Sequence, residues 1–391
     1  MTPVALGTGP VEESALVRGL QDERLATSGT VVGGYGQIQA RWVGVGPSPT
    51  YEGEATVRRL VLFVSHDFSS FGLPIRAYTE FEWENAIAGE GQPGSVEVEQ
   101  AFLDWRIAGD ALTLRSGLIL VPFGIINQWH EPPVFNGVNR PSLDEILIPS
   151  TWRELGVGFT GKPGILRYEV YAMTALDPTG FDDVGIVNGR TLGASSPADA
   201  IAFSGRVEVE PTLGLVAGVS GYASDTGPAQ EWYSPTGDPL KLSLPVYGAE
   251  VDARFRGFGV EARVLGVGFW LPESDDLMEA RKADGSPYFV EGSGVIPTHM
   301  RGGYVELGWN VLYPFDTSHE LVPFARLEHY DTQAAVPEGM DANPLRTVDE
   351  GTFGLTYRPI PNVSFKADVV LRDRKYGDDE LQWDVGVGYM F

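Results

Sequence analysis

The stretch ELQWDVGVGYMF, residues 380–391, alternates strictly between two kinds of side chain. From Leu381 to Phe391 every second residue is apolar, and the residues between them are small or polar except for Met390. A period of two over eleven residues is typical of a β-strand with two unlike faces. The apolar face meets either the core of a soluble sandwich or membrane lipid, so the rest of the chain has to separate these two interpretations.

Composition excludes several classes of function. The chain has 391 residues, with 53 Asp and Glu against 28 Lys and Arg, a net charge of -25. Such an acidic chain is not expected to bind nucleic acid, which calls for basic patches. It has no cysteine, so disulfides, thiolate metal sites and cysteine nucleophiles are excluded. We expect residues 1–28 to be an irregular N-terminal segment, periplasmic or disordered, without a signal-peptide pattern.

The period-two pattern recurs along the whole chain and predicts about sixteen strands. Most have the length that a tilted strand needs to cross a bilayer, roughly 9–11 residues, whereas a membrane helix needs roughly 20 apolar residues. The predicted strands lie near residues 30–42, 56–68, 73–84, 95–107, 110–121, 153–161, 164–174, 199–210, 213–223, 244–255, 258–270, 301–312, 320–330, 351–359, 362–373 and 381–391.

Short turns and long loops alternate between these strands. Tight turns rich in Gly, Pro and Asp, such as SSFG, AGD and GKPG, follow the second, fourth and sixth strands. The other connections are mostly long, near residues 43–55, 122–152, 175–198, 224–243, 271–300 and 331–350. This alternation is typical of a membrane barrel with turns on the periplasmic side and loops outside. It predicts a single transmembrane antiparallel β-barrel over residues 29–391; a soluble sandwich would not place its long loops at every second connection.

The faces of the strands support the same fold. Outward aromatic residues gather near both predicted membrane surfaces, as amphipathic rings do in barrel proteins. These girdle residues are Trp42, Trp83, Trp270 and Trp383 at one end and Tyr357, Tyr389 and Phe391 at the other.

The opposite face carries the charged residues, because a basic side chain facing lipid at the midplane costs about 2–4 kcal/mol. Acidic residues accompany the basic ones, so the predicted wall is close to charge balance. The predicted pore-lining residues are Arg41, Arg59, Arg76, Glu80, Glu82, Arg106, Arg115, Arg167, Glu169, Arg206, Arg254, Arg263, Arg326, Arg358, Lys366 and Arg372.

Two central segments carry a family resemblance. GLILVPFGIINQWHEPPVFNGVNRP, residues 117–141, followed by STWRELGVGFTGK, residues 150–162, resembles the outer-membrane porin family that includes the phosphate- and polyphosphate-selective O/P-type porins. In that family a strand ends in a similar Pro-Phe-Gly, and the strand after the next long loop opens with a Trp-x-Glu-x-Gly-like pattern. The chain departs from the phosphate-selective members because its predicted wall is not predominantly basic, which leaves the solute open.

The resemblance implies a 16-stranded channel, often trimeric, whose third external loop folds inward to narrow the pore. That loop is the connection at about 122–152, which is rich in proline. Its charged residues are the candidates for the constriction, and the alternative for each is a solvated or internally paired charge. They are His130, Glu131, Arg140, Asp144 and Glu145.

No enzyme motif accompanies this pattern. GVGFTG at 156–161 lies inside a predicted strand and opens no helix, so it is not a dinucleotide-binding loop. The five histidines show no metal-ligand spacing, and a barrel hydrolase using His329 beside Glu328 is the weaker alternative. We therefore predict no catalytic residue, no metal and no cofactor.

The predicted function is an outer-membrane porin, a passive diffusion channel for small hydrophilic solutes or ions in a Gram-negative bacterium. Its expected partners are outer-membrane lipid and lipopolysaccharide, a possible homotrimer, and the barrel assembly machinery, which would read the C-terminal strand ending in Phe391. The alternative is a structural or receptor barrel whose loops bind a partner and whose lumen is plugged.

Overall fold

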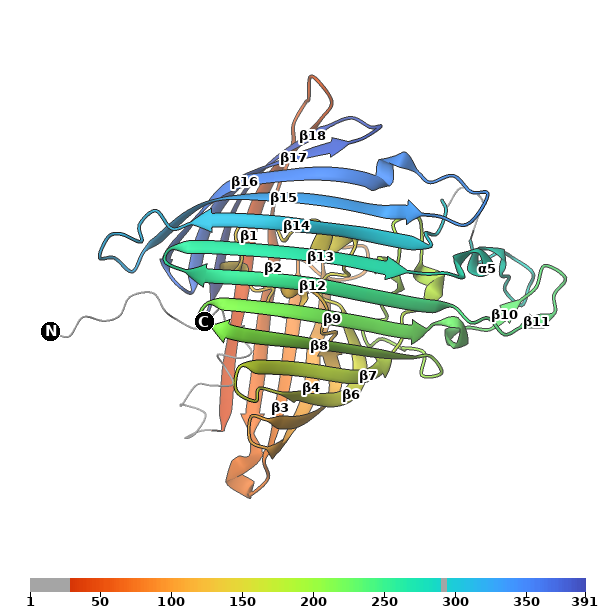
Figure 1. The fold of residues 1–391 in the computed structure, drawn as a ribbon, viewed down its shortest axis with the longest axis horizontal. Coiled ribbons are helices and arrows are strands. Elements are labelled where there is room, and N and C mark those ends of the chain that lie inside the picture. Colours follow the sequence, from red (N-terminus) through yellow and green to blue (C-terminus); the bar gives the residue numbers. More distant parts are fainter. Residues whose placement is uncertain (1–28, 290–293) are drawn as a thin grey trace.

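A computed structural model describes residues 29–289 and 294–391; the predicted N-terminal segment 1–28 lies outside the described residues. The chain forms a closed antiparallel barrel of sixteen strands, which confirms the predicted fold class (Figure 1). The barrel strands are β1 (Thr30–Val45), β2 (Glu52–Asp67), β3 (Ile75–Glu84), β4 (Ser95–Ala108), β5 (Leu112–Leu120), β6 (Arg153–Gly161), β7 (Leu166–Thr174), β8 (Ile201–Thr212), β9 (Leu215–Asp225), β12 (Pro245–Gly257), β13 (Val260–Trp270), β14 (His299–Trp309), β15 (Glu320–Ala335), β16 (Thr347–Ile360), β17 (Val363–Arg374) and β18 (Glu380–Met390).

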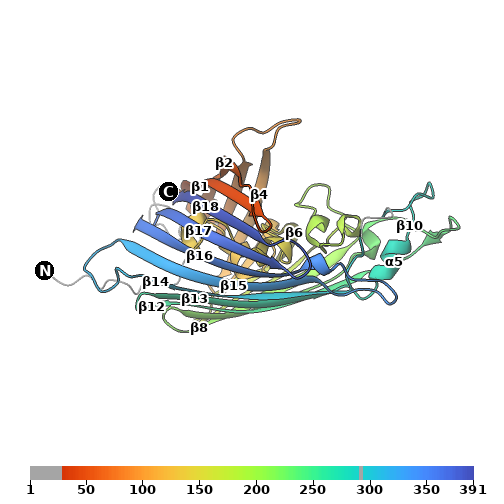
Figure 2. The same cartoon turned by 90° about the horizontal axis from the view of Figure 1, so that it is seen from above.

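The remaining elements lie in the connections. Strands β10 (Trp232–Tyr233) and β11 (Pro239–Leu240) form a separate two-stranded sheet. The α-helices of the described residues are short: α3 (Ile125–Gln128), α4 (Leu143–Ile146) and α5 (Ser274–Glu279). None of the helices within 29–289 and 294–391 has the length and apolar character needed to cross a bilayer. Figure 2 shows α5 and β10 together beyond the ends of the strands, where Tyr233 and Arg281 form an isolated bridge.

The barrel closes where its first and last strands meet. Strand β1 pairs with both β2 and β18, and Trp42 stands opposite Trp383 in the β1–β18 register. Past the end of that ladder, Phe391 N–H donates to Gly34 O at 2.9 Å and Gly34 N–H donates to Phe391 O at 3.1 Å. Because every barrel strand has two neighbours, the sheet presents no open edge.

The predicted alternation of connections is present. Short turns lie at 68–74, 109–111, 162–165, 213–214, 258–259 and 361–362, with the longer 310–319 at the same end. Most connections at the other end of the barrel are long, apart from 46–51 and 375–379. The predicted loops at 43–55 and 331–350 are shorter, at 46–51 and 336–346, because β1, β2, β15 and β16 extend beyond the predicted strand ends. The added residues include exposed Glu52 and Glu54. A strand that projects past the lipid into water no longer needs apolar outward residues, so its end is not marked in the sequence.

Register shifts interrupt the strict period of two in several strand pairs, and two of them lie in β1–β2 and β3–β4. The β1–β2 register shifts between Gln37 and Ile38. The β3–β4 register shifts so that Glu80 pairs with Gln100 and Phe81 with Val98, which leaves Glu99 as the extra residue of β4. Glu99 and Gln100 are consecutive, yet both are buried on the inside, 0% and 4% exposed. A bulge re-aims side chains in this way.

The outer surface carries an apolar belt with aromatic residues toward its ends. Trp42, Trp270 and Trp383 are exposed near the long-loop end, and Trp83 there is half-buried. Phe391 is exposed at the short-turn end, where Tyr357 and Tyr389 are half-buried. Two exposed tryptophans that the sequence analysis did not name, Trp105 and Trp309, lie near the short-turn ends of β4 and β14. The largest core, by contrast, lies inside the barrel.

Candidate functional site

The loop at 121–152 connects β5 to β6 and folds into the barrel interior. It is the third long-loop-end connection along the chain, and nearly all of its residues are buried. Of the whole segment only Gln128, Asn139, Ile146 and Ser150 are half-buried, and only Glu145 is exposed. The polar space that remains inside the barrel therefore lies between this loop and the wall.

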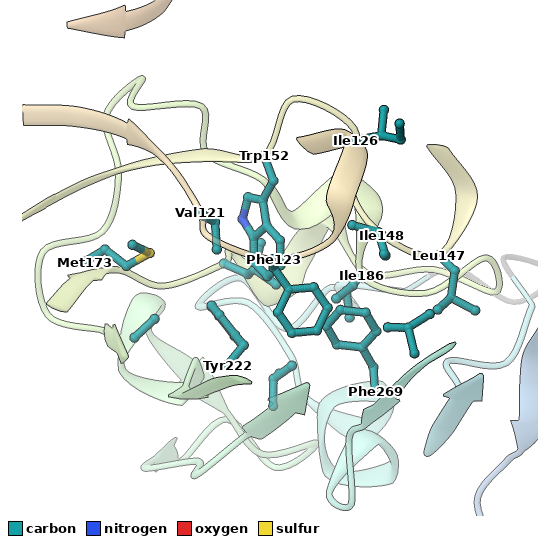
Figure 3. Packing of buried hydrophobic residues seen from close by; sticks show 14 of the residues in the cluster. Val121, Phe123, Ile126, Leu147, Ile148, Trp152, Met173, Ile186, Tyr222 and Phe269 are labelled. Carbon is teal, nitrogen blue, oxygen red and sulfur yellow. The ribbon is translucent and has the colours of Figure 1, made fainter. Parts of the chain in front are cut away.

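The Pro-Phe-Gly motif begins the inward turn. Gly124 has a φ of 78°, in the left-handed region that favours glycine, directly before α3. Phe123 is fully buried, and its ring centroid lies 6.1 Å from that of Trp152 and 5.1 Å from that of Phe269. Figure 3 shows these rings with Tyr222 and Ile148 in one apolar cluster. One side of the lumen is thus filled by loop and wall side chains rather than by water.

The base of the loop is closed by Asn127. Its side-chain nitrogen donates to Val121 O at 2.8 Å and to Trp152 O at 3.1 Å, and its side-chain oxygen accepts from Trp152 N–H at 2.7 Å. One buried amide therefore joins both ends of the loop.

Basic wall residues hold the loop's carbonyl groups. Lys366 Nζ donates to Pro132 O and Phe135 O at 2.6 Å each, Arg358 Nε donates to Pro133 O at 3.2 Å, and Arg263 Nη2 donates to Val134 O at 2.5 Å. Buried carbonyls need such partners, and charged donors make the stronger hydrogen bonds. These three cations are engaged with the loop.

Acidic wall residues hold the loop's N–H groups on the other side. Asp368 Oδ2 accepts from Val138 N–H at 2.5 Å. Glu328 accepts from Ser142 N–H at 3.3 Å and from Leu143 N–H at 3.0 Å, while Ser142 Oγ donates to Glu350 at 2.8 Å. The loop is therefore fixed to β15–β17 through its backbone.

A second group of wall charges is paired within the sheet. Arg206, 3% exposed, lies 2.9 Å from Glu208, 2.9 Å from Glu250 and 2.6 Å from Asp252. Arg254 lies over the Trp129 ring at 3.1 Å and 3.3 Å from Glu208. These groups join β8 and β12 to the loop and are buried.

A polar cavity of about 200 Å³ remains between the loop and the wall. Four arginines and four carboxylates contribute to its lining, so it is close to charge balance. The charged lining residues are Arg41, Arg140, Arg326, Arg372, Glu145, Glu350, Asp368 and Glu380.

The predicted constriction residues separate into two groups. Arg140 and Glu145 line the polar cavity. His130, Glu131 and Asp144 are buried within the packing of the loop and do not line it. Burial and the neighbouring Glu328 carboxylate raise the pKa of Asp144 to about 8, and both of its oxygens lack hydrogen-bond partners.

The predicted pore-lining residues also fall into groups. Arg41, Arg326 and Arg372 line the cavity. Buried residues outside it, held by the loop or by neighbouring wall groups, are Arg59, Glu80, Glu82, Arg206, Arg254, Arg263, Arg358 and Lys366. Half-buried residues toward the short-turn end or beside the loop are Arg76, Arg106, Arg115, Arg167 and Glu169.

Ion pairs of the half-buried group are short. Arg106 and Arg76 share Asp67, at 2.7 Å and 3.3 Å, and Arg115 lies 2.7 Å from Asp104. Most charged side chains of the wall are thus paired with neighbouring residues of opposite charge.

Sequence reasoning missed Glu99 and Asn127. The signal for Glu99 is a change of parity in β4: Val96 and Val98 point outward at even positions, whereas Leu103 and Trp105 point outward at odd positions. Such a change requires an extra residue between them. Nothing in the linear pattern marks Asn127, whose partners are backbone groups of the two loop ends.

No protein-family model matches the chain. A protein of Aquifex aeolicus (strain VF5), described as an uncharacterized protein, is 29% identical over 369 residues, covering 93% of this chain and 80% of that protein.

Solved structures share the fold at low identity. Pseudomonas putida OprB aligns with a TM-score of 0.56 and 11% identity over 94% of this chain and 96% of OprB. The outer-membrane channel DcaP of Acinetobacter baumannii aligns with a TM-score of 0.55 and 12% identity over 93% of this chain and 97% of DcaP. Salmonella typhi OmpF, solved with daunomycin, aligns with a TM-score of 0.53 and 12% identity over 93% of this chain and 97% of OmpF. The chain therefore has the barrel fold of outer-membrane porins, and the O/P-type likeness remains a resemblance in sequence.

Proposed function

We propose that this protein is a passive diffusion channel of the bacterial outer membrane for small hydrophilic solutes or ions. Its support is the closed barrel with an apolar outer belt, a fold shared with OprB, DcaP and OmpF. The observation that carries the proposal is the polar cavity of about 200 Å³ beside an inward loop. A channel needs a hydrated path inside and lipid-compatible residues outside.

Arg140 gives this path a preferred solute charge. Its Nη1 atom donates to Ser150 Oγ and, at 3.1 Å, to Thr151 Oγ1, whereas Nε and Nη2 have no hydrogen-bond partner. The other arginines of the cavity each have a carboxylate within 3.2 Å: Arg41 has Asp384, Arg326 has Glu306 and Glu328, and Arg372 has Glu350.

Nε and Nη2 are buried, so Arg140 acts on a solute through its charge: a cavity arginine without a paired carboxylate leaves a positive charge beside the path, which favours small anionic solutes. The proposed solutes are therefore small hydrophilic molecules that carry one anionic group, along with inorganic anions.

The test is single-channel recording of the purified protein in planar bilayers. We expect discrete conductance steps and a reversal potential in a salt gradient that favours anions. Arg140→Ala should shift that reversal potential toward cations, whereas Lys162→Ala, at an exposed turn outside the cavity, should leave it unchanged. Equal reversal potentials for Arg140→Ala and the unchanged protein would show that Arg140 does not determine the ion selectivity.

The burial of loop 121–152 favours a second candidate function, a receptor or structural barrel with a plugged lumen. In that case the folded protein gives no conductance steps at any voltage, and the exposed long-loop end carries the interaction. The same recordings decide between the two functions.

The proposed partners follow from the barrel's surroundings. Its apolar belt faces outer-membrane lipid and lipopolysaccharide, and the assembly machinery reads the C-terminal strand ending in Phe391. A homotrimer is supported by OmpT of Vibrio cholerae, which was solved in a trimer form and aligns with a TM-score of 0.50 and 11% identity. The mass of the detergent-solubilised particle, corrected for bound detergent, tests the trimer.

A further inference from the structure

A side-chain cluster inside the barrel is used by none of the channel features above. Glu80 comes from β3, Glu99 from β4 and His130 from the loop. One potential ligand atom from each lies within 4.8 Å of the other two, and the three residues are 3%, 0% and 3% exposed. Among the described residues these three alone meet this geometry.

The bulge in β4 builds one half of this cluster. It turns Glu99 inward together with Gln100, whose side-chain nitrogen donates to Glu80 Oε2 at 2.6 Å. Tyr78 OH donates to the same Glu80 oxygen at 3.1 Å, and Tyr35 OH donates to Glu99 Oε2 at 3.3 Å. Neighbouring donors thus orient both carboxylates.

The loop backbone orients the imidazole. His130 Nδ1 lies 3.1 Å from Asn127 O, and only a protonated ring nitrogen can donate to a carbonyl. His130 Nε2 is then the atom that faces the carboxylates, 3.1 Å from Glu99 Oε1 and 2.9 Å from Tyr35 OH. Metal-binding histidines have this arrangement, with one nitrogen on a backbone carbonyl and the other on the ion.

The cluster holds two carboxylates and one imidazole. Glu82, beside it, is paired with Arg59 at 3.6 Å. Among residues 29–289 and 294–391, no Arg or Lys lies within salt-bridge distance of Glu80 or Glu99, and the basic group beside Glu99 Oε1 is the His130 imidazole at 3.1 Å. One imidazole carries at most one positive charge, so it cannot balance two ionised carboxylates; a bound divalent cation can, and an unpaired buried charge is strongly unfavourable.

We infer that Glu80, Glu99 and His130 bind one divalent transition-metal ion of the Zn²⁺ class. A nitrogen and two oxygens suit such ions, whereas Ca²⁺ and Mg²⁺ prefer all-oxygen sites. The 3.1 Å between His130 Nε2 and Glu99 Oε1 fits two ligands that each lie about 2.0–2.2 Å from one ion. Glu80 completes the site by a small side-chain movement.

The bound ion joins the loop to two strands of the wall. Its ligands come from β3, β4 and the segment just after α3, so it fixes the position of the loop beside the polar cavity. This role is separate from the solute path, since none of the three ligands lines that cavity. The metal site and the proposed channel function can therefore be tested independently of each other.

The experiment uses the full chain in detergent, treated with a chelator, dialysed and then titrated with Zn²⁺. Calorimetry is expected to give one tight site per chain, and bound zinc after desalting should match it. Binding should be lost in Glu99→Gln and in His130→Gln. His329→Gln should retain it. Exposed His329 lies outside the cluster, 2.8 Å from Asp349, so this variant measures how much Zn²⁺ binds at the protein surface.

Retention of the tight site in folded Glu99→Gln, or its absence in the chelator-treated unchanged protein, would overturn the inference. Circular dichroism checks that each variant keeps its barrel. Should both ligand variants fail to fold, Co²⁺ added to the unchanged protein supplies a second readout. A visible absorption spectrum of a mixed nitrogen and oxygen site supports the inference, and the spectrum of the hydrated ion contradicts it.

Discussion

The side chain of Asn127 exchanges two hydrogen bonds with the backbone of Trp152, accepting from its N–H at 2.7 Å and donating to its C=O at 3.1 Å. Trp152 is the last residue before β6, and Asn127 lies on α3 at the start of the loop. This pair closes a long chain segment inside the barrel, where water is not available to replace a lost partner.

Asn127→Ala should therefore loosen the loop. The substitution leaves the buried Trp152 N–H without its partner, which costs about 1–3 kcal/mol. We expect a lower free energy of unfolding in urea and noisier conductance steps. Asn188→Ala is the matched control, because exposed Asn188 bonds only to Asp182 and should change neither. Unchanged stability of Asn127→Ala would mean that the apolar cluster alone holds the loop.

The outward face of the barrel was predictable because lipid imposes one rule on it. Every second residue must be apolar, so the number and order of the strands and the position of the long loop at 122–152 could be predicted from alternation and turn chemistry, whereas its inward folding was expected only from the family resemblance. Lipid imposes this rule only within the bilayer, which is why β1, β2, β15 and β16 were predicted to end too early at the long-loop end.

The inward face follows no such rule. Tyr171, Tyr222 and Phe269 point into the lumen and pack against the loop, where a water-filled channel would favour polar residues. An inward arginine can line the cavity or donate to a loop carbonyl, depending on the path of the loop. Sequence periodicity carries no information about that path. Periodicity predicts Arg263 and Arg358 on the inner face, but the loop carbonyls to which they donate are visible only in the structure.

Arg206→Met tests the charge network between β8 and β12. The variant leaves Glu208, Glu250 and Asp252 buried without their shared cation, and breaking a buried pair in this way costs about 3–5 kcal/mol. We expect the midpoint of urea unfolding to fall sharply. Arg167→Met serves as the comparison, since Arg167 reaches Glu208 only at 4.0 Å and is more exposed, so its loss should cost about 0–1 kcal/mol. Similar unfolding midpoints for the two variants would contradict the conclusion that Arg206 is the buried cation shared by these three carboxylates.

Leu327→Arg tests which face meets lipid. Leu327 is 57% exposed, near the middle of β15, and an arginine at the bilayer midplane costs about 2–4 kcal/mol. We expect less folded barrel in lipid vesicles and a lower free energy of unfolding. Leu213→Arg is the control, because Leu213 is 53% exposed but lies in the short turn 213–214, where the cost is about 0–1 kcal/mol. If both variants fold equally well, the exposed belt is not a lipid-facing surface.

Asp144→Asn tests the buried carboxyl group on α4. Burial and Glu328 raise the pKa of Asp144 to about 8 in the folded protein, and Arg326, Arg140, Glu145 and Tyr304 are the other charged or titratable groups that act on it. A group whose pKa is raised by folding contributes its stability fully below its unfolded pKa of about 3.9, and this stability is lost as the pH rises through 8.

The unchanged protein should therefore lose stability relative to Asp144→Asn as the pH rises from about 4 to 8, because its unfolded state ionises at Asp144 while its folded state holds the proton. Asparagine has nearly the same shape and does not titrate in this range. Urea unfolding of both proteins at a series of pH values measures the difference. Asp316→Asn, at an exposed position of the connection 310–319, is the control for the general effect of replacing a carboxyl group by an amide. A constant difference between the two proteins across this range would show that Asp144 is ionised inside the barrel.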